Sequence, residues 1–214
     1  KNGQKSPNSP PALTYRSGAS DAQAKAQVAL NYSTRRGNAF PSLTKASIIS
    51  GMATNKPPSL RFLFSHPAHL IACGFGSGLS PFAPGTFGTL FAWASFLLFK
   101  PWLNELELAV LLLVCLLGGI LAIHKTGADL GVVDHGSIVW DEIVPFWLVL
   151  AYCPASLSWQ GGAFLLFRLF DITKPQPARF FDRQVKNGFG VMADDLVAAG
   201  YSIGALAALQ YLLK

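Results

Sequence analysis

Residues 106–123 read LELAVLLLVCLLGGILAI, and this stretch decides the fold class. Its single charged side chain is Glu107, which lies near the beginning. A helix of this length rises by about 27 Å, close to the roughly 30 Å hydrocarbon core of a bilayer. We therefore predict that this stretch is a membrane-spanning helix.

Four further apolar segments surround it and extend the prediction to the rest of the chain. They cover residues 81–99, with the helical part beginning near Thr86, and residues 143–152, 161–170 and 196–213. The two middle segments are short, so they could form a hairpin, re-enter the membrane or lie buried between the others. The pattern predicts an all-α fold, a multi-pass membrane helical bundle.

The overall composition favours a membrane protein over a soluble one. Hydrophobic residues make up 51% of the chain and charged residues only 13%. A soluble domain usually has about 25% charged residues to cover its surface. A very apolar soluble helical domain is the alternative interpretation.

The basic charge is concentrated in the leading segment. Residues 1–61 hold nine Lys or Arg and a single acid, Asp21, whereas the rest of the chain has more acids than bases. The net charge of +6 therefore gives no argument for nucleic-acid binding. Residues 1–60 are rich in Ser, Pro, Asn and Lys, and we predict a disordered or non-native extension, with Met52 as the natural start and 61–214 as the folded domain.

The loop charges predict an orientation in the membrane. If all five segments cross, Lys100 and Lys214 lie on one side, and every other Lys and Arg lies on the opposite side. The positive-inside rule makes that opposite side cytoplasmic. Two polar loops, residues 124–142 and 171–195, would then meet at the cytoplasmic face. We predict that these two loops are the catalytic loops.

These two loops contain eight of the eleven acids in the chain. Two adjacent pairs, Asp141-Glu142 and Asp194-Asp195, stand near the beginning of apolar helices, where capping and the helix dipole would favour one acid but explain two less well. Carboxylate oxygens suit Mg²⁺, which also borrows ligands from phosphate. We predict that the Mg²⁺ ligands and catalytic residues are Asp141, Glu142, Asp171, Asp194 and Asp195; capping with salt bridges is the alternative.

Basic residues in the second loop are the phosphate-binding candidates. These are Lys174, Arg179 and Arg183, because guanidinium forks match phosphate oxygens. Pro177 is expected in the first turn of a new helix, with its basic side toward lipid headgroups and Phe180 on the apolar side. A solvated amphipathic helix is the alternative.

Glycines and histidines give weaker signals. Gly188 and Gly190 are predicted to let backbone amides approach an anion. We expect His69 to have a surface role, because no third ligand accompanies the His66 and His69 pair. His135 is expected either to carry a proton or to stabilise a turn.

Four longer motifs closely resemble the phosphatidylglycerophosphatase A family. They are GFGSGLSPFAPGTFGTL (74–90), DHGSIVWDE (134–142), FRLFDITKPQPARFFDR (167–183) and GFGVMADD (188–195), within a resemblance that covers residues 66–213. The resemblance implies an all-helical, Mg²⁺-dependent phosphatase of the bacterial inner membrane. Its substrate would be phosphatidylglycerophosphate, converted to phosphatidylglycerol during phospholipid biosynthesis.

A membrane carrier without enzymatic activity, with an acidic metal site, is the alternative function. Its acids should face a path through the bilayer, yet none of the five apolar segments has an acid at its centre. A soluble phosphatase is a third possibility. No sequence pattern indicates a protein partner.

Overall fold

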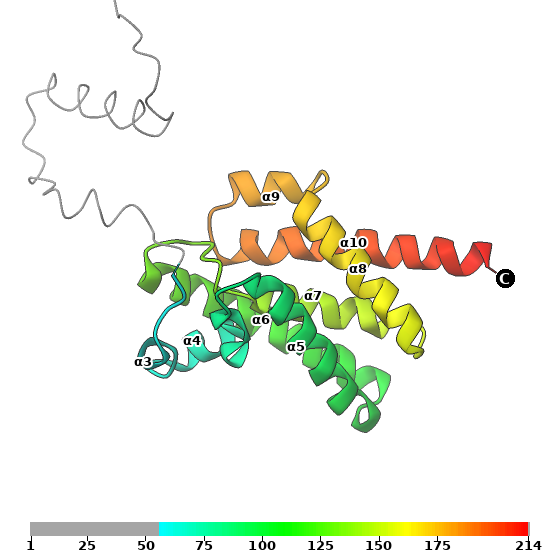
Figure 1. Cartoon of the computed structure of the whole chain (residues 1–214), viewed down its shortest axis with the longest axis horizontal. Helices are drawn as coiled ribbons and strands as arrows, with labels where there is room; N and C mark the ends of the chain where they lie inside the picture. The colour runs from blue at the N-terminus through cyan, green and yellow to red at the C-terminus, as the bar shows by residue number, and fades with distance from the viewer. Residues whose placement is uncertain (1–55, 214) are drawn as a thin grey trace, which may run out of the picture. The chain divides into compact units, whose positions relative to one another are not determined.

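The structure, a computed structural model, describes residues 56–213, and these contain only helices connected by turns and loops (Figure 1). The α-helices are α3 (Leu60–Leu63), α4 (Pro67–Ala72), α5 (Pro84–Phe99), α6 (Glu105–Leu130), α7 (Trp140–Ala151), α8 (Leu157–Thr173), α9 (Ala178–Gln184) and α10 (Gly188–Leu212). Two 3₁₀ helices, η1 (Gly74–Leu79) and η2 (Lys100–Trp102), flank α5. The all-α prediction is confirmed for this part of the chain. The predictions for Met52 and for the residues before 56 lie outside it.

Local sequence signals fix both ends of α6. Asn104 and Glu107 form a reciprocal capping box at its beginning, with each side chain accepting the other residue's backbone N–H at 2.9 Å. Gly131 ends the helix in the left-handed conformation, at φ 72°. The helix is therefore longer than the apolar stretch that predicts it.

Helix α5 begins at Pro84, two residues before the predicted Thr86. Ala83 takes the left-handed conformation, at φ 45°, and turns the chain into the helix. Proline suits the first helical position, because its missing N–H has no partner there and its φ is already helical.

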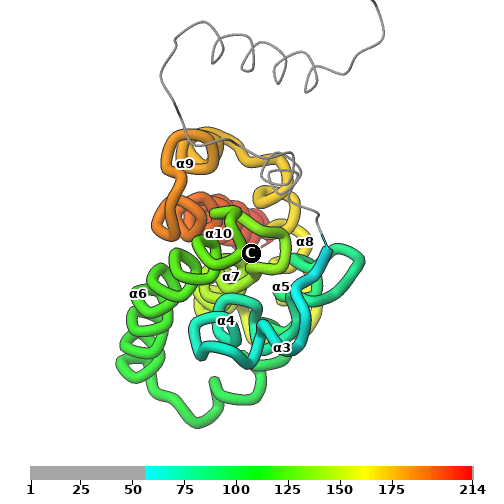
Figure 2. The backbone as a smooth tube through the Cα atoms, turned by 90° about the vertical axis from the view of Figure 1, so that its left-hand side faces the viewer, coloured from blue at the N-terminus to red at the C-terminus, as the bar shows by residue number. Residues whose placement is uncertain are grey.

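Two helices, α6 and α10, are long and apolar enough to cross a membrane by length and composition. The other three predicted spans form helices of only 12 to 17 residues. In the most apolar part of α6 only 22% of residues are buried in the protein. Figure 2 shows α6 along one side of the bundle. The core helix of a soluble protein buries its apolar side chains, so this exposure favours contact with lipid.

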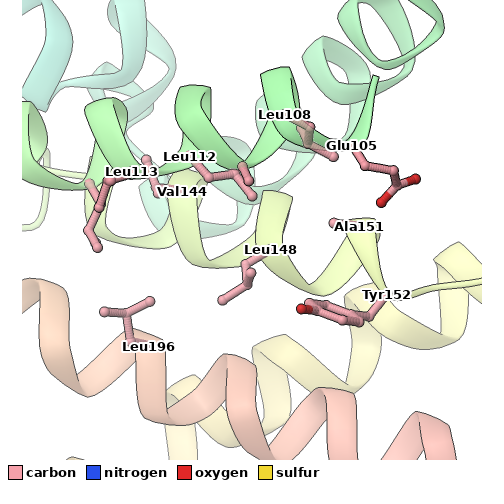
Figure 3. A pocket seen from close by; sticks show the side chains of 11 residues that line it. Glu105, Leu108, Leu112, Leu113, Val144, Leu148, Ala151, Tyr152 and Leu196 are labelled. Atoms are coloured by element: carbon pink, nitrogen blue, oxygen red, sulfur yellow. The ribbon is translucent and has the colours of Figure 1, made fainter. Parts of the chain in front are cut away.

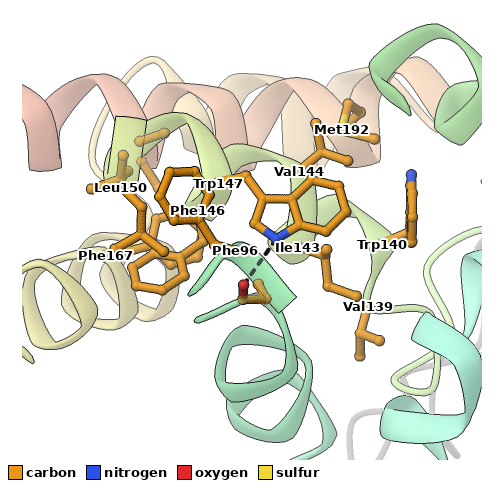
Figure 4. Close-up of a cluster of buried hydrophobic side chains, with 14 of the residues drawn as sticks. Phe96, Val139, Trp140, Ile143, Val144, Phe146, Trp147, Leu150, Phe167 and Met192 are labelled. Carbon is orange, nitrogen blue, oxygen red and sulfur yellow. Dashed lines mark hydrogen bonds between the residues drawn. The ribbon is translucent and has the colours of Figure 1, made fainter. Parts of the chain in front are cut away.

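Helix α7 forms the centre of the core (Figure 4). Phe146 and Val149 are fully buried, and α7 packs against both α5 and α10. The indole N–H of Trp147 donates to the Ala92 carbonyl of α5 at 2.9 Å. These contacts fix the first turn of α7, which carries Asp141 and Glu142.

An apolar groove lies between α6, α7 and α10 (Figure 3). Its volume is about 330 Å³, and leucines such as Leu112 and Leu148 form its walls. Leu196 of α10 is at one end, and Glu105 and Tyr152 are at the other.

Candidate active site

Three helix ends bring the predicted carboxylates together. Asp141 and Glu142 lie in the first turn of α7, Asp171 in the last turn of α8, and Asp194 and Asp195 near the beginning of α10. Four of these side chains are buried, and the Glu142 side chain is only 14% exposed. The two acidic stretches, although distant in sequence, therefore meet at one end of the bundle.

Arg168 connects the two stretches. Its Nη1 lies 3.0 Å from Glu142 Oε2 and 2.5 Å from Asp171 Oδ2, and its side chain is only 15% exposed. Arg168 lies in the motif of residues 167–183, but the sequence alone predicted no role for it. A lone arginine in an apolar helix, three residues before an acid, was the signal that could have identified it.

Lys174 connects α8, α9 and α10. It ends α8 in the left-handed conformation, at φ 43°, which only a few non-glycine residues adopt. Its Nζ lies 3.0 Å from Asp182 Oδ1 and 2.5 Å from Asp194 Oδ2. Burial disfavours the ammonium, but the hydrogen bonds and charges of Asp194 and Asp182 outweigh it and raise the pKa of Lys174. The amine is therefore a fixed positive charge beside the carboxylates.

Asp141 and Asp195 have no such partner. Neither forms an ion pair within residues 56–213, and the Asp141 Oδ1 atom is buried without a hydrogen-bond partner. Burial, followed by the charges of Glu142 and other neighbouring acids, raises the pKa of Asp141 well above its ordinary value. The centre of the cluster therefore favours either a bound proton or a bound cation.

Residues of helix α5 determine the position of the Glu142 carboxylate. Thr89 Oγ1 donates to Glu142 Oε2 at 3.2 Å. A Cβ on Gly85 would lie 1.9 Å from Glu142 Oε1, so any side chain there would force the carboxylate out of its position. Burial raises the pKa of Glu142 to about 7, although the charge of Arg168 opposes the shift.

Gly188 and Gly190 lie at the beginning of α10, where the sequence predicted that backbone amides approach an anion. Gly188 and Gly190 serve packing, because a Cβ would lie 2.3 Å from the Ile120 carbonyl oxygen and 1.8 Å from the Val185 carbonyl oxygen. The N–H of Gly190 is already donated to the Asn187 side chain. These glycines therefore bring α10 close to its neighbours, and the approach of an anion to the Gly188 amide stays a prediction.

The surface role expected for His69 is wrong. His69 is 3% exposed, and its Nε2 lies 2.8 Å from Asp129 Oδ2, which ties α4 to α6. Burial depends on this packing between distant helices, which the local sequence does not reveal. His135 is also buried, and its Nδ1 accepts the Ser137 N–H at 3.1 Å, as expected for the turn-stabilising role.

The basic residues of α9 lie away from the carboxylates. The helix begins at Ala178 and ends at Gln184, so Pro177 is its N-cap residue and does not lie in the first turn, where it was predicted. Arg179 and Arg183 are exposed and form no ion pair with any described residue; Arg179 Nη2 donates to the Thr173 carbonyl at 3.4 Å. Phe180 is 54% exposed. The structure therefore brings Lys174 into the cluster and leaves the two arginines at the surface.

The donor set suits a hard cation, although the side chains do not form a complete cage. Within residues 56–213, no three His, Cys, Asp or Glu side chains are arranged as a ready metal site. Arg168 and Lys174 hold Glu142, Asp171 and Asp194 in ion pairs. Mg²⁺ is usually bound by one or two carboxylates together with substrate phosphates and water. Asp141 and Asp195, which are buried and unpaired, fit that smaller requirement.

Comparison with known proteins identifies the family. The sequence model of phosphatidylglycerophosphatase A matches residues 70–210. The Haemophilus influenzae phosphatidylglycerophosphatase A is 48% identical over 74% of this chain and 98% of its own length. The Escherichia coli phosphatidylglycerophosphatase A is 46% identical over 68% of this chain and 85% of its own length.

A third relative, from Bacteroides thetaiotaomicron, is 38% identical over 67% of this chain and 94% of its own length, and is provisionally named a phosphatidylinositol-3-phosphatase. No solved structure matches this chain. The resemblance inferred from the four sequence motifs is confirmed. The chain belongs to the phosphatidylglycerophosphatase A family, a family of phosphatases.

Proposed function

We propose that this chain hydrolyses phosphatidylglycerophosphate to phosphatidylglycerol and phosphate, in a reaction that needs Mg²⁺. The names of two close relatives support the substrate and the reaction. The unpartnered, buried Asp141 oxygen among like charges is the observation that supports the cation. Buried carboxylates without partners are costly unless they are protonated or bind a positive ion.

Asp141 and Asp195 would hold the ion, with Glu142, Asp171 and Asp194 around it. When bound, Mg²⁺ withdraws charge from the phosphoryl oxygens and helps to position the attacking group. Arg168 fixes the carboxylates of Glu142 and Asp171, so that the acids keep their places. Such preorganised charge lowers a barrier without reorganisation during the reaction.

Lys174 would stabilise the charge that develops on the phosphoryl group. Its ammonium is held beside Asp194 and stays protonated. Arg179 and Arg183, which are exposed on α9, would attract the anionic headgroup and the membrane surface. The attacking group is either water or an aspartate that becomes phosphorylated. In both cases the phosphate–glycerol ester bond breaks and the lipid oxygen takes up a proton and leaves as an alcohol. A phosphorylated aspartate would then be hydrolysed by water, which releases phosphate and restores the carboxylate.

The proposed location is the bacterial inner membrane, with several crossings and the site facing the cytoplasm. The exposed apolar side chains of α6 support contact with lipid. The excess of Lys and Arg on the side of the acidic loops supports the orientation. Thiol labelling of single cysteines placed at Arg183 and Lys100 in intact and opened cells would test this orientation.

The substrate is tested with the purified full-length chain in detergent micelles. Phosphate release is measured from phosphatidylglycerophosphate and from phosphatidylinositol 3-phosphate at equal surface concentrations. We expect rapid release from the first lipid, and loss of turnover on replacement of Asp195 with Asn. Asp129→Asn is the matched control, because Asp129 lies outside the cluster and binds His69. Preference for the inositol lipid, or normal turnover of Asp195→Asn, would refute the proposal.

A further inference from the structure

A second apolar groove runs along α10 on the side of α8. It is shallow and open to the outside, with a volume of about 550 Å³, and is lined by Phe170, Pro177, Val197, Gly200, Tyr201, Gly204 and Ala205. Its first part lies on the same face of α10 as Asp194, because Val197 and Tyr201 follow Asp194 by three and seven residues. From α8 the groove is lined by Phe170, the residue before Asp171. The groove therefore begins beside the candidate phosphate site and continues along a helix long enough to cross a membrane.

Two glycines form the floor of this groove. A Cβ on Gly200 or on Gly204 would meet no atom within 4 Å, so the internal packing of the described residues does not require glycine at either position. Gly85, Gly188 and Gly190 differ, since a Cβ on each would collide with a neighbour. Glycine inside a helix costs about 1 kcal/mol relative to alanine. The absence of side chains at Gly200 and Gly204 leaves space on the outer surface of α10.

Aromatic side chains hold one wall of the groove in place. The rings of Phe170 and Tyr201 lie 5.4 Å apart. The Tyr201 hydroxyl donates to the Gln176 carbonyl at 2.5 Å, in the turn that follows Lys174. The turn that carries the cationic end of the site is thus tied to the middle of α10.

We propose that this groove binds an acyl chain of the phospholipid whose phosphate enters the carboxylate cluster. A phosphate beside Lys174 places the lipid's apolar part toward Phe170 and Val197, on the same side of α10. From Val197 to Ala205 the helix rises about 12 Å, which is comparable to one leaflet of a bilayer core. The groove of Figure 3 is lined mainly by α6 and α7. Phe170 and Pro177, which precede and follow Lys174 in the chain, instead line the groove along α10, so that groove suits the acyl chain better. The inference rests on the proposed lipid phosphatase activity.

Filling the floor of the groove provides the test. Gly204→Leu adds a side chain where the protein offers open space, so the helix is expected to fold. Activity is measured on dioleoyl phosphatidylglycerophosphate, on its dihexanoyl form and on the deacylated headgroup. Because each methylene removed from an apolar site weakens binding severalfold, we expect kcat/KM for the dioleoyl lipid to fall about tenfold. The kcat/KM of Gly204→Leu for the deacylated headgroup should equal that of the unmodified protein.

Three comparisons decide the outcome. Gly118→Leu is the matched control, because Gly118 also lies in a spanning helix with no atom within 4 Å of its Cβ position; it should leave all activities unchanged. An equal loss on the deacylated headgroup, or no loss on the dioleoyl lipid, would overturn the acyl-chain assignment. Leu148→Trp fills the groove of Figure 3. If Leu148→Trp lowered kcat/KM for the dioleoyl lipid and Gly204→Leu did not, the assignment would also be overturned. If the unmodified protein releases no phosphate from any of the three compounds, the proposed function itself has failed.

A second copy of the chain is the competing occupant, since small residues spaced by four also suit helix association in membranes. Chemical cross-linking in native membranes distinguishes a second copy of the chain from an acyl chain as the occupant of the groove. Our proposal predicts that Gly204→Leu leaves the cross-linking pattern unchanged while selectivity for long-chain lipid falls. Loss of a cross-linked dimer with an equal fall on all three compounds would show that the groove is a subunit interface.

Discussion

Arg168 of α8 and Glu142 of α7 form a buried ion pair of 3.0 Å. The same Arg168 nitrogen also binds Asp171. One guanidinium thus joins α7 to α8 at the candidate active site. Removing one member of a buried pair leaves the other charge without compensation, which is more costly than losing the pair.

Replacement of Arg168 with Leu should therefore lower both stability and turnover. We expect the free energy of unfolding to fall by about 3 to 5 kcal/mol, as for other broken buried pairs. Turnover should fall about 100-fold or more, because the carboxylates lose their fixed arrangement. Thermal unfolding and phosphate release check the two effects. Arg61→Leu, at an exposed position outside the site, is the control; an unchanged Arg168→Leu protein would contradict the assigned role.

Gly85 should tolerate no side chain. Its Cβ would overlap the Glu142 carboxylate at 1.9 Å, so Gly85→Ala is expected to displace Glu142 from Arg168 and Thr89. The predicted result is a strong loss of turnover with a loss of stability of about 1 to 3 kcal/mol, the usual cost of overpacking. Gly118→Ala, in open space on α6, should match the unmodified protein. Full activity of Gly85→Ala would show that the carboxylate position is unimportant.

Asp141→Asn should separate stability from activity. It replaces a buried carboxyl whose pKa is raised and whose Oδ1 has no hydrogen-bond partner among residues 56–213, so the protein without metal should be at least as stable as the unmodified one. Turnover should be lost, and the rise in Tm on addition of Mg²⁺ should disappear. Differential scanning calorimetry with EDTA and with Mg²⁺ measures both. A Tm rise equal to that of the unmodified protein would remove Asp141 from the cation site.

The Glu142 carboxyl predicts a pH dependence. Its pKa is raised from 4.5 to about 7, so between these values the folded protein holds a proton that the unfolded chain releases. The stability of the metal-free protein should therefore fall as pH rises across this interval. Mg²⁺ competes with the proton, so the Tm increase that it causes should grow over the same interval.

Glu142→Gln isolates the contribution of this carboxyl from those of the other acids. In EDTA, the Tm of the variant relative to the unmodified protein should rise with pH, because glutamine does not ionise. Unfolding followed from about pH 4.5 to about pH 7 provides the measurement. A pH-independent difference would show that Glu142 has an ordinary pKa.

Arg179 and Arg183 should act through the membrane surface. Because both are exposed and outside the carboxylate cluster, replacing both with Ala should raise KM on anionic vesicles several-fold and change kcat little. The effect should weaken at high salt, where surface charges are screened. Kinetics at low and high ionic strength check this. A main effect on kcat would instead move the arginines into the reaction centre.

The sequence was sufficient for the features that depend on local composition. The apolar run of residues 106–123 identified α6, and the paired acids identified the region of the site, because charge is otherwise scarce in this part of the chain. The resemblance to the family supplied the substrate.

The features that were missed depend on partners from other helices. Arg168 gains its role only when α7 lies beside α8, and His69 becomes buried only when α4 packs on α6. Similar glycines also serve different purposes: Gly190 touches Val185, whereas Gly204 leaves a groove open. The residue type alone does not reveal whether a glycine permits close packing or leaves open space.

Phosphate release from phosphatidylglycerophosphate, titrated with Mg²⁺ after removal of metal by EDTA, tests the central claim most directly. The purified full-length protein should be inactive without metal and should gain activity as Mg²⁺ saturates one class of site. Asp141→Asn should stay inactive at every concentration. Full turnover in EDTA, or an Asp141→Asn titration that matches the unmodified protein, would contradict the account.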